Sequence, residues 1–91
     1  APSCLYIDSN DSLYVCDVNN GRVQKWLTNA SSGSTVSDPA LTTSPEDVAV
    51  DKNGFLYVSD SSLHHVVRYP PGSTSGTVVA GKTNIASSSL A

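Results

Sequence analysis

Cys4 and Cys16 are the residues of this 91-residue chain whose types and spacing point most directly to a chemical role. If the segments around Ile7 and Leu13 pair as an antiparallel hairpin, the two cysteines face each other across it. Facing cysteines predict a cross-strand disulfide, which would close a short loop and stabilise the fold by about 3 kcal/mol. Two reduced thiols buried in a cytosolic protein are the alternative.

Two N-x-S sequons begin at Asn10 and Asn29, and neither has proline in its middle position. Such sequons accept N-linked glycans when a chain passes through a secretory compartment. Sequons also arise by chance in a chain that is rich in Ser, Thr and Asn. Together with paired cysteines, which persist in oxidising compartments, they predict a secreted, extracellular glycoprotein.

His64 and His65 are the other side chains that could bind a metal ion. Successive strand residues point to opposite faces of a sheet, so the two imidazoles cannot easily share one metal. We expect one histidine to face solvent and the other to pack. No G-x-S-x-G motif marks a nucleophile, and no glycine-rich loop opens a helix to hold phosphate. The sequence therefore predicts no catalytic residue, no metal site, no cofactor and no enzyme activity.

Charge and hydropathy narrow the range of partners. The formal net charge is −3, and the five Lys and Arg residues are scattered singly along the chain. Nucleic acids and anionic membranes attract clustered positive charge, so neither is an expected partner. The apolar runs are about four residues long, whereas a membrane-spanning helix needs about 20.

The sequence repeats itself at an offset of 43 residues, without insertion or deletion over most of the first copy. Identical residues recur in order: Pro2 and Pro45, Asp8 and Asp51, Asn10 and Asn53, Leu13-Tyr14-Val15 and Leu56-Tyr57-Val58, Asp17 and Asp60, Val23 and Val66. At other positions an apolar residue of the first copy corresponds to a different apolar residue of the second, as Leu5 does to Val48 and Ile7 to Val50. A period of this length is typical of propeller blades.

Each repeat is predicted to form four short strands. They are expected at residues 4–8, 13–17, 22–27 and 34–37 and at residues 47–51, 56–60, 65–69 and 77–80. A three-residue loop joins the first two strands, and its last residue, Asp11 or Gly54, should be left-handed. Both faces of each hairpin are largely apolar, unlike those of a sheet with one wet face. The sequence thus predicts an all-β chain of two antiparallel blades, residues 1–43 and residues 44–91, the second with a Ser/Thr-rich connector.

The ordered pattern resembles the NHL repeat family of β-propellers. The residues that carry the resemblance are Pro2, 5–8, 13–17, Asn20, Arg22 and Val23 in the first repeat and Pro45, 48–51, Asn53, Gly54, 56–60 and Val66 in the second. His65 stands where the family has Arg, and Asp11 stands where it has the turn Gly. The resemblance implies that Asp17 accepts backbone N–H groups of the following turn and pairs with Arg22, and that Asp60 plays the same part.

The resemblance also implies a ring of about six blades, of which this chain supplies two. Two blades cover one face of each other and leave two apolar faces bare, and such patches drive association. Trp26 and Tyr69 hold equivalent third-strand positions, where we expect packing between blades, with ligand stacking as the alternative.

We therefore expect a secreted structural module that associates head to tail with other copies of itself, into a closed ring or a fibril. Further blades of a longer parent chain are the alternative cover for the bare faces. A propeller that binds proteins or glycans is the second functional expectation, and a metal-dependent lyase or lactonase on this fold is the third.

Overall fold

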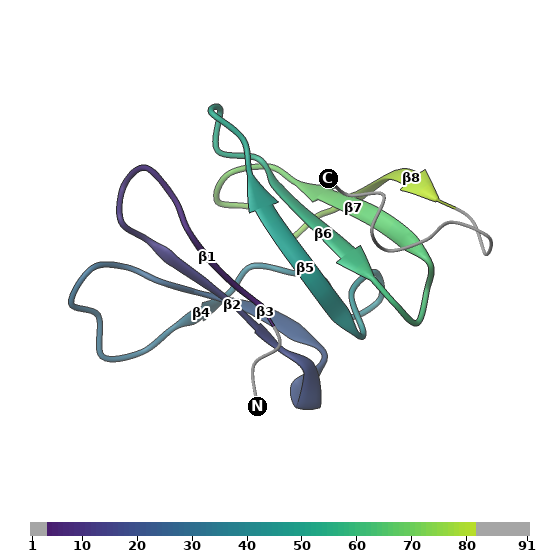
Figure 1. Ribbon diagram of the computed structural model, residues 1–91, viewed down its shortest axis with the longest axis horizontal. Helices are drawn as coiled ribbons and strands as arrows, with labels where there is room; N and C mark the ends of the chain where they lie inside the picture. Colours follow the sequence, from purple (N-terminus) through teal and green to yellow (C-terminus); the bar gives the residue numbers. More distant parts are fainter. Residues whose placement is uncertain (1–3, 82–91) are drawn as a thin grey trace.

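Two four-stranded antiparallel sheets make up the part of the chain, residues 4–81, that the computed structural model describes. The first sheet has the order β1-β2-β3-β4 and the second has the order β5-β6-β7-β8 (Figure 1). The strands are β1 Leu5–Ile7, β2 Leu13–Asp17, β3 Arg22–Trp26, β4 Ser34–Thr35, β5 Pro45–Val50, β6 Leu56–Asp60, β7 His65–Tyr69 and β8 Thr77–Gly81. Pro2 and the connector beyond Gly81 lie outside the described residues.

The predicted hairpin register is confirmed in both sheets. Tyr6 lies opposite Tyr14 in the first hairpin, and Ala49 lies opposite Tyr57 in the second. Asp11 and Gly54 both adopt the predicted left-handed conformation, with φ of 64° and 88°. The aspartate that ends the first strand stabilises each turn. In the first turn, the backbone N–H groups of Asn10 and Ser12 donate to Asp8 Oδ1 at 2.9 Å.

The second hairpin repeats this arrangement one blade later. Asp51 Oδ1 accepts from the backbone N–H groups of Asn53 (2.9 Å) and Phe55 (3.0 Å). Tyr57 Oη donates to Asp51 Oδ2 (3.3 Å), as Tyr14 Oη donates to Asp8 Oδ2 in the first hairpin (3.2 Å). The equivalent bonds give the repeat a physical basis, because the same aspartate organises the same turn in each blade.

Three local features differ from the sequence prediction. Val18–Asn20 form a short 3-10 turn, which ends at Gly21 in the left-handed conformation (φ 61°). The β5 ladder shifts register between Pro45 and Asp47, where proline offers no N–H to the ladder. The strand β4 is only two residues long; beyond it Val36 N–H still donates to the carbonyl oxygen of Val23 (2.9 Å), but Val23 N–H donates to the side-chain Ser37 Oγ (3.0 Å).

Each sheet has two faces, which we call face A and face B. Face A of the first sheet carries Leu5, Ile7, Leu13, Val15, Gln24 and Trp26, and its face B carries Cys4, Tyr6, Tyr14, Cys16, Val23 and Lys25. At the 43-residue offset, face A of the second sheet carries Val48, Val50, Leu56, Val58, Val67 and Tyr69, and its face B carries Asp47, Ala49, Tyr57, Ser59, Val66 and Arg68.

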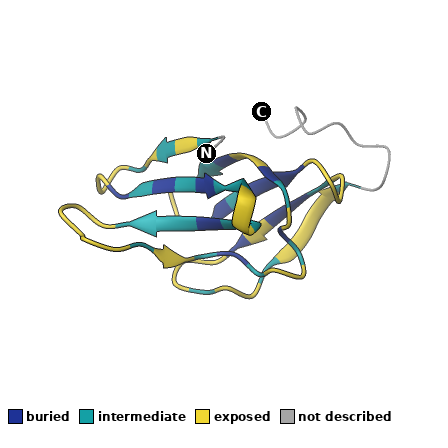
Figure 2. Ribbon diagram, turned by 90° about the horizontal axis from the view of Figure 1, so that it is seen from below, coloured by how far each residue is buried: buried dark blue, intermediate teal, exposed yellow. Residues whose placement is uncertain are grey.

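The core lies between face B of the first sheet and face A of the second. Its buried members are Tyr14, Cys16, Val23, Val48, Leu56, Val58, Val67 and Tyr69. The strands β1 and β2 lie against β5 in the middle of the molecule, whereas β4 and β8 lie at its outer edges (Figure 1). Buried residues gather in the central strands, and the hairpin tips are exposed (Figure 2). No helix within residues 4–81 is long and apolar enough to cross a membrane.

Candidate functional site

The contact between the two sheets shows how one blade docks on the next. Valine and leucine side chains fill its centre, and polar contacts surround them. Tyr6 Oη donates to the carbonyl oxygen of Val50 (3.1 Å) and so links the innermost strands of the two sheets. Tyr69 is 1% exposed, and its Oη lies 2.7 Å from Thr42 Oγ1 and accepts from the N–H of Asp38 (3.0 Å). Tyr69 therefore packs between the blades and anchors the segment that connects them.

Face A of the first sheet is bare. Leu5 and Ile7 are 64% and 61% exposed, whereas the residues equivalent to them in the second sheet, Val48 and Val50, are 5% exposed and half-buried, respectively. Trp26 is half-buried in the position where Tyr69 is covered completely. The same kind of surface that forms the core on one sheet is thus open on the other.

Face B of the second sheet is the other outer surface. Tyr57 and Ala49 are half-buried there, and Arg68 is exposed with its guanidinium carbon 5.0 Å from the centre of the Phe55 ring. Ser59 is fully buried, but its Oγ has no hydrogen-bond partner among residues 4–81. A buried hydroxyl without a partner costs about 1–3 kcal/mol.

Sequence reasoning did not single out Ser59, or Gln24 on the opposite outer face. The repeat itself contains the signal that could have found them. Each is polar where its equivalent in the packed joint, Cys16 or Val67, is apolar. Positions that break the apolar pattern between repeats mark where the outer faces differ from the packed ones.

The predicted disulfide joins Cys4 and Cys16 across β1 and β2, with the Cα atoms 5.0 Å apart. That separation lies within the usual range for disulfides. Cys16 is fully buried in the joint between the sheets. Asp47 and Ser59 occupy the equivalent positions in the second sheet, so only the first blade carries the bridge.

Asp60 is a buried carboxylate that ties the inter-blade segment to the β6–β7 turn. Its Oδ2 accepts from the backbone N–H groups of Thr43 (2.6 Å) and Ser44 (3.0 Å), and its Oδ1 accepts from those of Ser62 and Leu63 (both 2.9 Å). Burial acts to raise the pKa of Asp60, but the backbone hydrogen bonds outweigh it and hold the pKa below its ordinary value. The bonds from the following turn are those that the resemblance implied.

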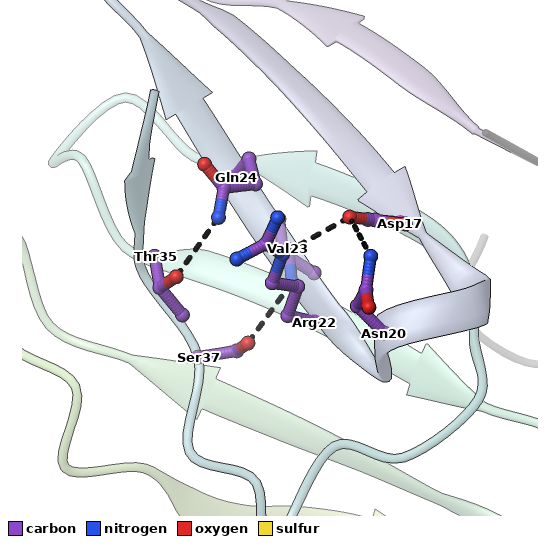
Figure 3. Close-up of polar contacts among 7 residues, drawn as sticks. All are labelled: Asp17, Asn20, Arg22, Val23, Gln24, Thr35 and Ser37. Atoms are coloured by element: carbon purple, nitrogen blue, oxygen red, sulfur yellow. Dashed lines mark hydrogen bonds and ion pairs between the residues drawn. The ribbon is translucent and has the colours of Figure 1, made fainter. Parts of the chain in front are cut away.

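Asp17, the equivalent in the first blade, has a different set of partners. Its Oδ2 accepts from Asn20 Nδ2 (2.9 Å) and from Arg22 Nε (3.0 Å) (Figure 3). These two bonds, that of Asn20 first, lower the pKa of Asp17. The expected backbone bonds are not made, because residues 18–20 coil into a 3-10 turn that the Asp17 side chain does not cap. The ion pair with Arg22 is present.

The two histidines lie apart from any cluster of metal ligands. His65 Nε2 is 2.7 Å from the carbonyl oxygen of Leu41, and His64 is exposed in the left-handed conformation (φ 55°). Within residues 4–81, no group of three or more His, Cys, Asp or Glu side chains is placed to hold a metal ion.

Both sequons lie at the same end of the first blade. Asn10 is exposed at the tip of the β1–β2 hairpin, and Asn29 is exposed in the β3–β4 loop with φ of 63°. The two loops are neighbours, since Thr28 Oγ1 donates to the carbonyl oxygen of Asp11 (3.2 Å). Glycans at both positions would therefore cover one end of this blade.

A groove of about 900 Å³ opens between the two blades at this same end. Its lining includes Tyr6, Lys25 and Asn10 from the first blade and Lys52 and Pro71 from the second. Lys25 Nζ lies 5.5 Å from the centre of the Tyr14 ring. The groove is where the two sheets diverge, and it offers both cationic and aromatic groups to solvent.

Comparison with known families adds a direct match. The model of the NHL repeat matches residues 1–26 and 42–69, whereas a comparison with curated proteins gives no significant match. The two matched segments make up more than half of the chain and contain the first three strands of each sheet. The sheets are equivalent in register, and one docks on the other as propeller blades do. With two repeats of that kind, the chain belongs to the NHL repeat family.

Proposed function

We propose that this chain is a non-enzymatic assembly module whose blade pairs stack head to tail. One observation carries the proposal: the joint within the chain sets face B of one blade on face A of the next. The two outer faces are the repeat equivalents of that pair, face A of the first blade and face B of the second. A second copy of the chain can therefore form the same joint, with its own face A on face B of the second blade.

The exposed side chains on face A suit a surface that becomes covered. Burying a leucine or isoleucine side chain completely contributes about 1.5–3 kcal/mol. Leu5 and Ile7 together therefore contribute about as much as the low end of the cost of association, about 4–15 kcal/mol. Association should consequently be weak and depend on concentration, with Trp26 and its neighbours adding to it.

Head-to-tail contacts of this kind either close or propagate. If the rotation between copies closes, about three copies would complete a ring of about six blades. If it does not close, the same contact extends into a fibril. The two outcomes differ in that the ring has a fixed mass and the fibril does not.

Light scattering on the purified chain tests the proposal, over a range from low to high micromolar concentration. We expect the mass to rise with concentration. Ile7→Glu, which places a charge on face A, should keep the chain monomeric. Leu63→Glu is the matched control, since Leu63 is 38% exposed but lies in the β6–β7 turn and not on an outer face. A folded wild-type chain that stays monomeric throughout would overturn the proposal.

An extracellular location is part of the proposal. The Cys4–Cys16 disulfide and the exposed positions of Asn10 and Asn29 support it. Secretion from a eukaryotic cell line, followed by enzymatic removal of N-glycans, should lower the mass of the product. Asn10→Gln and Asn29→Gln should each abolish one part of that shift. An unmodified secreted chain would remove the glycoprotein part of the proposal.

The groove favours a second candidate function, the binding of a glycan at the hairpin end of the blades. Tyr6 offers a ring and Lys25 offers an ammonium group within it. Saturation-transfer NMR with a set of neutral and acidic oligosaccharides tests this function. Lys25→Ala should reduce the signal from acidic sugars, and the absence of transfer from every sugar would exclude this candidate.

A further inference from the structure

The groove between the two blades has an apolar floor that continues the core. Tyr6, Val36 and Val50 line the groove, and each is half-buried and packed against the core cluster. Leu27 also lines the groove, and its side chain is 61% exposed. Leu27 belongs to neither outer face, so the stacking of copies gives no reason for its exposure.

Asn10 places a sequon on the lining of the same groove. Its turn is held by the backbone N–H groups of Asn10 and Ser12, which donate to Asp8 Oδ1 (both 2.9 Å). The turn is also tied to the segment that follows Leu27, because Thr28 Oγ1 donates to the carbonyl oxygen of the residue after Asn10 (3.2 Å). The attachment point for a glycan is therefore fixed beside the exposed leucine.

Asn29 carries the other sequon and provides an internal comparison. It is exposed in the β3–β4 loop, and within residues 4–81 it is not part of the groove lining. Glycans at the two sequons would therefore meet different surroundings, although both lie at the same end of the blade.

We propose that the first sugars of an N-linked glycan on Asn10 lie in the groove and cover its apolar floor. This placement rests on the proposed extracellular location, because such glycans are added in a secretory compartment. In the attachment, Asn10 Nδ2 bonds to C1 of the first sugar, the bond from C1 to a lipid-diphosphate carrier breaks, and Nδ2 loses one proton. The glycan then stays tethered at the edge of the groove.

The lining suits sugars of this kind. The C–H face of a sugar ring and the methyl group of an N-acetyl substituent are apolar, so they pack favourably on Tyr6 and Leu27. Lys25 supplies an ammonium group that can donate to sugar hydroxyl and carbonyl oxygens. A covalent tether gives the glycan a high effective concentration at the groove, so that contacts too weak to hold a free oligosaccharide are still populated.

NMR on the isotope-labelled chain, secreted by a yeast host, tests this placement. Nuclear Overhauser contacts are expected between the N-acetyl methyl group of the first sugar and the methyl groups of Leu27. Asn10→Gln should abolish these contacts, whereas Asn29→Gln should leave them in place. The two variants together assign the contacts to one glycan.

The rate of enzymatic trimming is a second measurement. An endoglycosidase that cuts between the first two sugars should release the Asn10 glycan about tenfold more slowly than the Asn29 glycan from the folded chain, and at similar rates after unfolding. Leu27→Ser should remove most of that difference, because it takes away apolar surface beneath the sugars. Leu63→Ser is the matched control, since Leu63 is also an exposed leucine but lies in the β6–β7 turn.

The outcomes separate this placement from the proposals that precede it. A chain glycosylated on Asn10 that shows no contact between sugar and groove would overturn the placement and leave the glycoprotein proposal standing. A secreted chain with no glycan on Asn10 would also overturn it, and one with no glycan on either sequon would overturn both. Light scattering measures self-association independently, so head-to-tail assembly is tested apart from the glycan.

Discussion

At the residue scale, Asp60 is the side chain on which the inter-blade connection most depends. It is 1% exposed and accepts four backbone hydrogen bonds, from residues on both sides of the β6 strand. Hydrogen bonds to a buried charge contribute about 1.5–3 kcal/mol each when measured singly. The group stabilises the fold only while it is ionised, because a protonated carboxyl accepts these bonds less well.

Asp60→Asn should lower the free energy of unfolding at neutral pH by about 2–3 kcal/mol. The pKa of Asp60 is lowered in the folded chain, so its stabilisation is present above the unfolded pKa, about 3.9. The contribution is lost as the pH falls through the lower folded value. Urea unfolding measured as a function of pH should show wild type and Asp60→Asn converging in acid. Asp11→Asn at an exposed turn is the control, and parallel curves for Asp60→Asn and wild type would contradict the prediction.

The two hairpin turns allow a matched test of backbone conformation. Asp11 and Gly54 are equivalent and both left-handed, but only glycine adopts that conformation without a steric penalty. Asp11→Gly should stabilise the fold by up to about 1 kcal/mol, whereas Gly54→Ala should destabilise it by about 1 kcal/mol or more. A Cβ at position 54 would also lie 3.1 Å from Pro71 Cγ. Chemical denaturation measures both, and changes of the same sign would refute this reasoning.

At the element scale, β1 is the strand with the weakest packing. It has three residues, and two of them, Leu5 and Ile7, are mostly exposed on the free face A. The disulfide joins Cys4, just before β1, to Cys16 of β2, whose side chain lies in the buried joint. The bridge therefore compensates for a strand that another blade would otherwise hold in place.

Cys4→Ala/Cys16→Ala should lower the free energy of unfolding by about 3 kcal/mol, the value expected for a loop of this size. The loss should fall first on β1, so hydrogen exchange should quicken at the amide of residue 16, which in the wild type donates to the carbonyl oxygen of Cys4 (3.0 Å). Reductant should have the same effect on wild type and none on the double variant. Equal stability of wild type in the presence and absence of reductant would show that the bridge contributes little.

Most of the strands could be predicted because their signals are local. The alternation around Tyr14 and Tyr57 fixed the register, and the aspartate–turn pattern fixed the hairpins. The 3-10 turn at Val18–Asn20 and the ladder shift at Pro45 could not be predicted, because each depends on the path of the chain at the end of a strand and not on the alternation within it. The same dependence explains why Asp17 and Asp60, at equivalent positions of the repeat but followed by different residues, differ in their hydrogen bonds.

The candidate site was harder to predict than the fold. Sequence indicated that two faces would be bare, but which face of each sheet is covered follows only from the packing. The disulfide was found because its residues face each other within one hairpin. Ser59 was missed, since a buried hydroxyl without a partner is visible only once its surroundings are known.

At the scale of the whole molecule, the two blades form a repeat that has no closed end within the described chain. Face B of one sheet is covered by face A of the other, so the pair keeps one outer surface of each kind, and on the outer face B of the second sheet Ser59 and Val66 are already buried. Repeat architectures that stack through neighbouring faces behave as one-dimensional assemblies, in which each joint contributes separately. The joint within the chain is therefore a structural template for the joint between chains.

The chemistry of the free face A predicts how that association responds to solvent. Leu5, Ile7, Leu13, Val15 and Trp26 supply apolar surface beside Gln24, and the two charged residues of this face, Asp17 and Arg22, already pair with each other. Association driven by apolar burial has a negative heat-capacity change and weakens on cooling. Raising the salt concentration should leave it nearly unchanged, because screening acts on charged pairs. Sedimentation at several temperatures and salt concentrations measures both dependences. Association that weakens steeply with salt would contradict this account, because it would mean that attraction between charges, such as those of Asp47 and Arg68 on face B, holds the copies together rather than apolar burial on face A.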